Sequence, residues 1–323
     1  MINIGIAGVG QFGQNHARIL QNCPICNFVG IFDKNMKRAS EIANRIGSKY
    51  FNDIESLLSQ IDALAIVVTT ISHYDLAKKA IESGIHVFIE KPITSTVKEA
   101  EELLTLAKLN NVQIQVGHIE RFNPIVMQIA DKIKDPKFIE CHRIAPFTPR
   151  GTDIPVVLEL MIHDIDFILA FVKSEVKEIR ASGSGVITKS IDIANARIEF
   201  ENGAVANITA SRISDKRSRK LRIFQKNAYF SMDFKDKKVK MIKKSKHLYK
   251  VLPKILKGDY ENIKKEDVVD VTLYDGNNEK KDALTTELES FVYSAEHNKK
   301  PIVDGLAGLK ALEVAVEIVN KIN

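Results

Sequence analysis

The stretch Ile2-Asn3-Ile4-Gly5-Ile6-Ala7-Gly8-Val9-Gly10-Gln11-Phe12-Gly13 decides the fold of the first half of this chain. An apolar run rich in β-branched residues passes into Gly8-x-Gly10-x-x-Gly13, and residues 14–20 then carry apolar side chains at helical spacing. The pattern predicts a strand, a glycine turn and a helix. Gly8 permits a tight turn, Gly10 lets the backbone approach a pyrophosphate, and Gly13 allows close packing of helix on strand. We therefore expect a dinucleotide whose phosphates lie at the helix N-terminus.

A second predicted strand, residues 27–33, ends in Asp33, twenty residues after Gly13. A carboxylate at this place accepts hydrogen bonds from the adenosine ribose and repels a 2′-phosphate, which favours NAD over NADP. Lys34 follows Asp33, and its positive charge would weaken the preference for NAD over NADP. The residues that we expect to contact NAD in this part of the chain are Gly8, Gly10, Gln11, Phe12, Gly13, Asp33 and Lys34.

The composition allows two domains with full cores, because the chain has 323 residues of which 45% are hydrophobic. The N-terminus lacks a signal-peptide pattern, and no apolar run approaches the ~18 residues that a membrane span needs. We therefore expect a cytoplasmic protein without an integral membrane segment.

Cys23 and Cys26 have the spacing of half a zinc or redox site, but only Cys141 remains elsewhere. Ordinary turn residues are the better interpretation, and no metal is expected.

Strand and helix patterns alternate over the first 120 residues, as they do in a doubly wound parallel sheet. We expect an NAD-binding Rossmann domain at residues 1–121 and an α+β domain at residues 122–323, with closing helices at 303–323 that could pack back near the first domain. The second domain should hold a large open, mainly antiparallel sheet, because short strand patterns joined by hairpin signals run from residue 176 to 234. Its exposed face is the natural place for subunit pairing.

Two predicted strands end in polar residues at the carboxyl edge of the first sheet, where ligands bind. One delivers Thr69, Thr70 and His73, and the next delivers Glu90-Lys91-Pro92. The cyclic side chain of Pro92 restricts the backbone of the preceding residue, so the position of Lys91 is defined. A lysine held there can stabilise the alkoxide that forms as a hydride leaves a hydroxyl-bearing carbon. The alternative is a solvated lysine that merely follows a strand.

A second candidate site lies in the predicted helix of residues 156–169. Glu159, His163 and Asp166 fall at i, i+4 and i+7, so on an α-helix they share one face of an otherwise apolar element. Histidine titrates near neutrality and can take the proton of a hydroxyl, with a neighbouring carboxylate fixing its tautomer. The competing hypotheses are a metal site and a core histidine without a chemical role.

These motifs together resemble the glucose-fructose oxidoreductase/inositol dehydrogenase (Gfo/Idh/MocA) family. The end of the chain is also similar to that family's closing helices, through Leu288-x-x-Phe291 and Pro301-x-Val303-x-Gly305. The resemblance implies NAD(P)-dependent oxidation of a sugar or polyol hydroxyl, and dimers or tetramers formed through the second sheet. Family members typically carry Asp-x-Gly-x-His where this chain has Glu159-Leu160-Met161-Ile162-His163, so Asp164 or Asp166 could orient the histidine instead.

Residues 117–124 and 161–166 are similar to the members that act on UDP-N-acetylglucosamine. That resemblance implies oxidation of its C3 hydroxyl to the 3-keto sugar, towards a 3-amino sugar of lipid A, with the hydroxyl between His163 and Lys91. Other sugars, a UDP-sugar uronate or a cyclitol are the nearer alternatives, and a non-catalytic NAD-sensing protein is the remote one. The residues expected to contact the nucleotide sugar are Arg121, Asn123, Glu159, Asp164 and Arg212; Arg121 could instead fix the domain junction.

The stretch from Arg212 to Lys257 is strongly basic, with seventeen Lys or Arg against three Asp. We interpret it as a solvated surface, with Arg212 to Lys220 the part that could meet a diphosphate. An anionic membrane surface is a further alternative. Nucleic-acid binding is not expected, because the stretch lacks a helix-turn-helix, a zinc finger or basic strands interleaved with aromatic residues.

Overall fold

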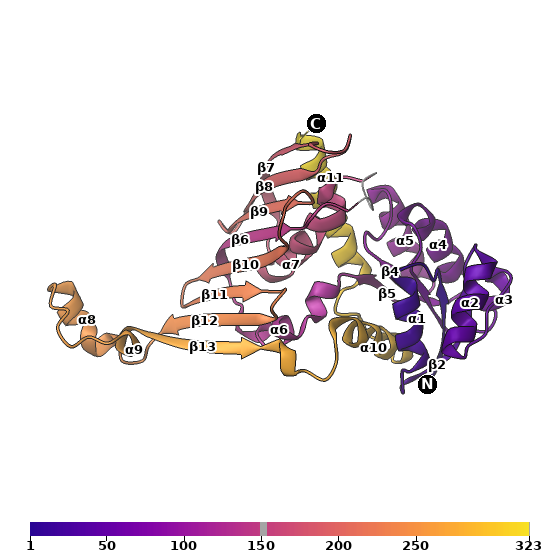
Figure 1. The fold of residues 1–323 in the computed structure, drawn as a ribbon, viewed down its shortest axis with the longest axis horizontal. Coiled ribbons are helices and arrows are strands. Elements are labelled where there is room, and N and C mark those ends of the chain that lie inside the picture. The colour runs from indigo at the N-terminus through magenta and orange to yellow at the C-terminus, as the bar shows by residue number, and fades with distance from the viewer. Residues whose placement is uncertain (149–153, 323) are drawn as a thin grey trace. The chain divides into compact units, whose positions relative to one another are not determined.

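The computed structural model describes residues 1–148 and 154–322, and its contacts divide the chain into two compact units. The first comprises residues 1–122 and 281–314, and the second comprises residues 123–280 and 315–323. Figure 1 shows one unit with a parallel sheet between helices and one with a long open sheet. Among the described residues, none of the helices combines the length and apolar character that a membrane span requires.

The first unit is a five-stranded parallel sheet in the order β2-β1-β3-β4-β5 with helices on its faces. This is the predicted doubly wound arrangement. The elements are β1 (Ile2–Ala7), α1 (Gly13–Gln21), β2 (Cys26–Phe32), α2 (Met36–Ile46), α3 (Ile54–Leu58), β3 (Ala63–Ile66), α4 (His73–Glu82), β4 (His86–Glu90), α5 (Val97–Leu109), β5 (Ile114–Gly117) and α10 (Ala283–Glu296). The 3-10 turns η1 (Thr70–Ser72) and η2 (Ile119–Phe122) follow β3 and β5.

Local signals start the helices of this unit where the sequence places them. The side chain of Asp53 accepts a hydrogen bond from the backbone of Ser56 and caps α3 as predicted. Residues 49–51 form only an isolated bridge between Ile31 and Tyr50. The strand that leads to Lys91 is therefore the fourth strand of the chain, β4.

Helix α10 belongs to the first unit, although the sequence assigned residues 281–302 to the second domain. Its side chains Leu288, Phe291 and Val292 are fully buried in the core that also contains Ile4 and Phe88. The rings of Phe88 and Phe291 lie 5.9 Å apart. Burying each such side chain contributes about 1.5–3 kcal/mol, and nothing local in the sequence reveals which core receives them.

The second unit contains an eight-stranded sheet in the order β13-β12-β11-β10-β6-β9-β8-β7. All neighbours are antiparallel except β6 and β9, which confirms the mainly antiparallel sheet. The strands are β6 (Pro136–Ile144), β7 (Val176–Ser184), β8 (Ile193–Phe200), β9 (Val205–Ser211), β10 (Ser218–Gln225), β11 (Ala228–Asp233), β12 (Lys238–Lys244) and β13 (Val269–Asp275). The helices are α6 (Pro124–Met127), the π-helix η4 (Val157–Met161), α7 (Ile162–Val172), α8 (Leu248–Leu256) and α9 (Lys265–Val268).

Helix α6 ends at Met127 and is followed by the 3-10 turn η3 (Ala130–Lys132). One helix of this unit differs from the sequence prediction. The expected helix of residues 156–169 begins as the π-helix η4 and becomes α-helical only from Ile162. The final helix, α11 (Gly305–Ile322), contributes residues to both units. The turn η5 (Gly276–Asn278) follows β13.

Candidate NAD site and active site

The glycine turn after β1 has the geometry that the sequence predicts. Gly8 has a φ of +92°, and a Cβ there would overlap the carbonyl of Val67. A Cβ on Gly13 would overlap the carbonyl oxygen of Gly8. A Cβ on Gly10, in contrast, would come no closer than 4.0 Å to a neighbour, the Arg38 guanidinium. The space over Gly10 is therefore open, and the pyrophosphate of NAD fits there against the start of α1.

Asp33 is held beside this turn at the end of β2. It is buried, its Oδ2 accepts a hydrogen bond from Val9 N at 2.8 Å, and its Oδ1 accepts one from Asn35 N at 2.8 Å. Each carboxylate oxygen keeps a second lone pair that can accept from a ribose hydroxyl. The exposed Arg38, which sequence reasoning missed, places Nη1 3.9 Å from Asp33 Oδ2. Lys34 is exposed next to it.

Both ring nitrogens of His73 contact backbone carbonyl oxygens at the carboxyl edge of the sheet. Its Nδ1 lies 2.9 Å from the carbonyl oxygen of Pro92 and its Nε2 lies 3.2 Å from that of Val68. The ring is almost completely buried, and burial lowers the pKa of His73. His73 thus links the ends of β3 and β4. Thr69 and Thr70, which are exposed and half-buried, lie on the same edge.

Glu90 connects α1 to the segment that carries Lys91. Its Oε1 lies 3.0 Å from Nε2 of His16, and its Oε2 accepts a hydrogen bond from the backbone N–H of Lys91 at 3.1 Å. His16 also donates from Nδ1 to the carbonyl of Phe12 at 3.1 Å. Burial alone would raise the pKa of Glu90, but the hydrogen bond and charge of His16 and the charge of Lys91 hold it below its ordinary value. Glu90 therefore positions the lysine, a role that its motif did not reveal.

Lys91 itself is half-buried directly after β4, and the Lys91–Pro92 peptide bond is cis. In the second unit, His163 is half-buried near the start of α7. The π-helix η4 comes directly before it, so Glu159 and His163 do not follow the α-helical spacing on which the shared face was predicted. Single π-turns inside helices occur frequently at functional sites.

Asp164 forms a buried ion pair. Arg143 from β6 binds it through two parallel hydrogen bonds, Nε to Oδ2 at 2.8 Å and Nη2 to Oδ1 at 2.9 Å. Both side chains are almost completely buried. This bidentate pair fixes the first turn of α7 to the sheet, and the substrate contact of Asp164 stays a prediction. Asp166, one turn further along α7, is also buried.

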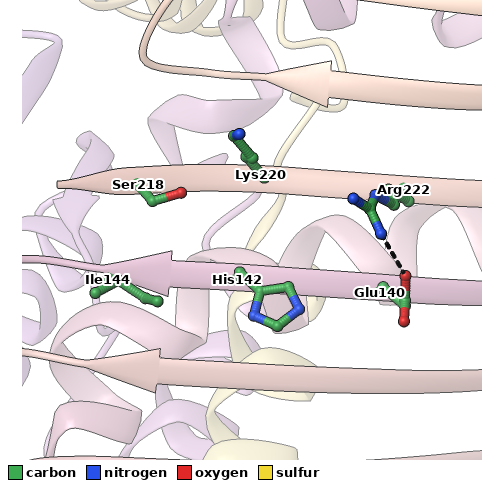
Figure 2. A pocket seen from close by; sticks show the side chains of 6 residues that line it. All are labelled: Glu140, His142, Ile144, Ser218, Lys220 and Arg222. Atoms are coloured by element: carbon green, nitrogen blue, oxygen red, sulfur yellow. Dashed lines mark hydrogen bonds and ion pairs between the residues drawn. The ribbon is translucent and has the colours of Figure 1, made fainter. Parts of the chain in front are cut away.

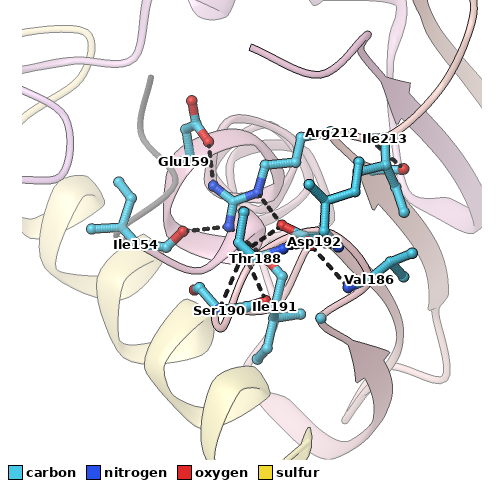
Figure 3. A network of polar contacts seen from close by, with 12 residues as sticks. Ile154, Glu159, Val186, Thr188, Ser190, Ile191, Asp192, Arg212 and Ile213 are labelled. Carbon is cyan, nitrogen blue, oxygen red and sulfur yellow. Dashed lines mark hydrogen bonds and ion pairs between the residues drawn. The ribbon is translucent and has the colours of Figure 1, made fainter. Parts of the chain in front are cut away.

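Arg212, for which the sequence predicted a diphosphate contact, is likewise buried. Figure 3 shows its guanidinium surrounded by protein groups, with Glu159 and Asp192 among its partners. The side chain is 4% exposed. The loop of residues 146–155, a predicted substrate loop, lies partly outside the described residues.

Arg121 and Asn123 have local roles at the end of the first unit and the start of the second. Arg121 Nη2 donates to the carbonyl of Ile302, another residue of the first unit, at 3.3 Å. The buried Asn123 caps α6 by accepting from the backbone of Ile125 at 3.3 Å, and Pro124 occupies the first helical turn as predicted.

A shallow pocket lies elsewhere, on the outer face of the second sheet. Figure 2 shows that side chains of the neighbouring strands β6 and β10 line it, namely Glu140, His142, Ile144, Ser218, Lys220 and Arg222. Arg143, next to them in β6, points to the opposite face and binds Asp164. This pocket is therefore not the candidate active site. Within residues 1–148 and 154–322, no cluster of three His, Cys, Asp or Glu side chains could hold a metal ion.

The glycine turn, Asp33 and the lysine at the sheet edge define an NAD-binding oxidoreductase with a Rossmann domain. Residues 2–118 match the family model described as "Oxidoreductase family, NAD-binding Rossmann fold", and residues 147–231 match the "GFO/IDH/MocA C-terminal domain". The chain belongs to the Gfo/Idh/MocA family, and it is an NAD-dependent dehydrogenase.

Two relatives illustrate the range of this likeness. The chain is 32% identical over 315 residues to UDP-N-acetylglucosamine 3-dehydrogenase from Acidithiobacillus ferrooxidans, covering 97% of this chain and 95% of that one. A solved structure of the same enzyme superposes with a TM-score of 0.88 at 31% identity, covering 99% and 97% of the two chains. The scyllo-inositol 2-dehydrogenase (NAD(+)) of Bacillus subtilis is 28% identical to this chain, and the match covers 66% of this chain and 68% of that one.

Proposed function

We propose that the protein oxidises the C3 hydroxyl of UDP-N-acetylglucosamine to the 3-keto sugar, with NAD as the electron acceptor. The observation that carries this proposal is the likeness to the Acidithiobacillus enzyme of that name, which extends over 97% of this chain, whereas the inositol dehydrogenase matches 66%. The keto group would then be converted to an amine, as synthesis of a 3-amino sugar for lipid A or the cell envelope requires. Because NAD and activated nucleotide sugars are cytoplasmic metabolites, we place the reaction in the cytoplasm.

Two side chains carry the chemistry in this proposal. His163 takes the proton from the C3 hydroxyl, and the ammonium group of Lys91 stabilises the alkoxide that this produces. Bound NAD accepts the two electrons and the hydrogen from C3. Lys91 belongs to the first unit and His163 to the second.

The remaining residues position these groups. Gly8, Gly10 and Gly13 shape the pyrophosphate site, and Asp33 orients the adenosine ribose. Glu90 fixes the backbone of Lys91, and the Arg143–Asp164 pair fixes the start of α7 beside His163. Such positioning can supply much of the rate enhancement when the cofactor itself provides the redox chemistry.

The proposal is tested by incubating the purified protein with NAD and a panel of UDP-sugars while following NADH absorbance. UDP-N-acetylglucosamine should support NADH formation and yield a 3-keto sugar that mass spectrometry identifies after trapping with hydroxylamine. UDP-glucose and UDP-N-acetylgalactosamine serve as matched controls that differ at one position of the ring. Rapid turnover of either control, with none of UDP-N-acetylglucosamine, would make the proposed substrate wrong.

A second candidate is the same chemistry on a free cyclitol. The observation that favours it is the 28% identity to the scyllo-inositol dehydrogenase. The panel therefore includes scyllo- and myo-inositol, and oxidation of these without any UDP-sugar would establish this alternative.

We further propose that two or four subunits assemble through the outer face of the second sheet. One row of side chains across six neighbouring strands is apolar and lies in register, namely Val205, Phe138, Phe224, Tyr229, Ile242 and Val271. The ring centroids of Phe138 and Phe224 are 5.7 Å apart, and those of Phe224 and Tyr229 are 4.8 Å apart. Phe224 and Val271 are 38% and 41% exposed in the single chain. A second copy covering this row would remove it from water.

A further inference from the structure

Asp192, just before β8, is a fixed anion at the centre of the network in Figure 3. Its side chain is completely buried and accepts five hydrogen bonds, from Val186 N at 2.9 Å, Ile187 N at 2.8 Å, Thr188 N at 2.8 Å, Thr188 Oγ1 at 2.7 Å and Arg212 Nε at 2.9 Å. Burial by itself would raise the pKa of Asp192, but the hydrogen bonds outweigh burial and hold it well below its usual range. This carboxylate therefore remains ionised and immobile.

The guanidinium of Arg212 is held on two sides by this network. Its Nε binds Asp192, and its Nη2 donates to the carbonyl oxygens of Ile154 at 2.6 Å and Ile191 at 2.9 Å. Because the guanidinium is planar and rigid, these three bonds determine the direction of its remaining nitrogen, Nη1. Nη1 donates to Glu159 Oε2 at 3.0 Å. The position of the Glu159 carboxylate is thus set by two buried side chains, Asp192 directly before β8 and Arg212 directly after β9.

Glu159 is the most accessible of the three charged side chains. It is 25% exposed, whereas Arg212 is 4% exposed and Asp192 is fully buried. Figure 3 shows one carboxylate oxygen directed at Arg212 and the other directed away from it. Glu159 also lies in the π-helix η4, which leads directly into α7 and His163. An oriented carboxylate on the element that leads to the predicted base can accept a hydrogen bond from a sugar hydroxyl.

We propose that Arg212 is a positioning residue, which holds Glu159 as an acceptor for a hydroxyl of the substrate and does not bind the diphosphate itself. The proposal rests on the proposed function, because it concerns the same sugar site. A diphosphate ligand would need an accessible guanidinium, and here the donors are directed at Asp192, Glu159 and two backbone carbonyls. The hydrogen bond between Arg212 and Glu159 is also charge-assisted, so its loss should strongly weaken the binding of the substrate hydroxyl by Glu159.

A double-mutant cycle tests this with Arg212→Lys, Glu159→Gln and the double variant. KM and kcat are measured for UDP-N-acetylglucosamine, or for whichever hydroxyl substrate the panel identifies, and UDP is used as a competitive inhibitor. Each single variant should lower kcat/KM about tenfold to a hundredfold, as expected for losing a hydrogen bond to a charged group. The double variant should be no worse than Glu159→Gln within about twofold, because Arg212 acts through Glu159. The inhibition constant of UDP should stay within about twofold of wild type.

Two further variants distinguish positioning from general damage. Glu159→Asp retains the charge but shortens the side chain, so it should lose activity almost as Glu159→Gln does. Arg222→Lys is the matched control, because Arg222 forms a comparable pair with Glu140 on the outer face of the sheet, 3.3 Å apart. It should leave kcat/KM unchanged. NADH affinity and the thermal midpoint should remain near wild type in Glu159→Gln and Glu159→Asp.

The proposal is overturned by any of three results. A UDP inhibition constant that rises tenfold in Arg212→Lys would show that Arg212 binds the diphosphate. Fully additive losses in the double variant would show that Arg212 does not act through Glu159, and wild-type kinetics in Glu159→Asp would show that the carboxylate needs no fixed position. If the wild type oxidises a substrate other than UDP-N-acetylglucosamine, the proposed function fails while the cycle still decides the role of Arg212.

Discussion

The Nε2 atom of His16 lies 3.0 Å from Oε1 of Glu90, and this contact ties the helix after the glycine turn to the residue that precedes Lys91. The pyrophosphate end of the NAD site and the lysine at the sheet edge are therefore mechanically connected through two side chains. Glu90 also accepts a hydrogen bond from the backbone N–H of Lys91. His16 and Glu90 can therefore affect the position of Lys91 without contacting the substrate.

We expect His16→Ala to lower the free energy of unfolding by about 1–3 kcal/mol, because it removes a partner of a half-buried carboxylate. It should also reduce kcat, since the backbone of Lys91 is held less firmly. Urea unfolding and steady-state kinetics measure the two effects. His297→Ala is the control, because that histidine is exposed on the surface at the end of α10. Equal effects of the two substitutions would contradict the role of the His16–Glu90 pair.

Lys91→Met and His163→Ala should each lower kcat/KM by about 10²–10⁴-fold while NADH binding changes little, because both side chains act on the reacting hydroxyl. Fluorescence titration with NADH and the rate of NADH formation separate binding from chemistry. Lys108→Met, a change at the end of α5 on the surface, should have no effect. If both site variants retained wild-type function, the protein would be an NAD sensor and not a catalyst.

Replacement of Asp33 should change the cofactor preference. In Asp33→Ser the repulsion of a 2′-phosphate disappears, and Lys34 and the nearby Arg38 provide positive charge for it. The ratio of kcat/KM for NADP to that for NAD should rise at least about tenfold. Asp62→Ser, at an exposed carboxylate just before β3, is the control. An unchanged ratio would mean that Asp33 does not face the adenosine ribose.

The stability of the chain should fall as the pH is lowered from 7 to 5. Burial lowers the pKa of His73 and of His86, and Nδ1 of His86 accepts a hydrogen bond from Gln113 N at 2.9 Å. A histidine whose folded pKa lies below its unfolded value of about 6.5 stabilises the fold above that pH, and the stabilisation is lost as protons bind the unfolded chain below it. Each of the two histidines adds at most about 1.4 kcal/mol per pH unit to the dependence of the unfolding free energy on pH.

His86→Asn should therefore flatten the dependence of the unfolding free energy on pH, as measured by urea unfolding at several pH values. The depressed pKa values of Glu90 and Asp192 affect a lower pH range, because carboxylates titrate in the unfolded chain near pH 4. An unchanged slope between pH 7 and 5 in this variant would contradict the assignment to His86.

Phe224→Lys should dissociate the oligomer, because it places a charge in the middle of the apolar row on the outer sheet face. Sedimentation velocity over a range of protein concentrations measures the change. Lys177→Glu, at an exposed position of β7 in the same sheet, provides the control. A wild-type chain that sediments as a monomer at all concentrations would exclude the proposed assembly.

Much of the first unit followed from local sequence. The three glycines, the acid after the second strand and the cap residue Asp53 each act within a few residues of their own position, so their geometry is visible in the chain order. The candidate base and the lysine were also recognisable, because their motifs are local. The strands β12 and β13 were missed although apolar residues alternate with polar ones in both, because the lysines of the stretch up to Lys257 were interpreted as a solvated surface.

By itself, then, the sequence determined that this chain binds NAD on a Rossmann domain and that an antiparallel sheet follows. The tertiary structure alone decided which carboxylate meets which cation: Asp164 pairs with Arg143, and Glu159 pairs with Arg212. It also assigned α10 to the first core. The physical reason is that a strand, a turn or a cap depends on neighbours in the chain, whereas a buried ion pair depends on which distant segments the folded core brings together.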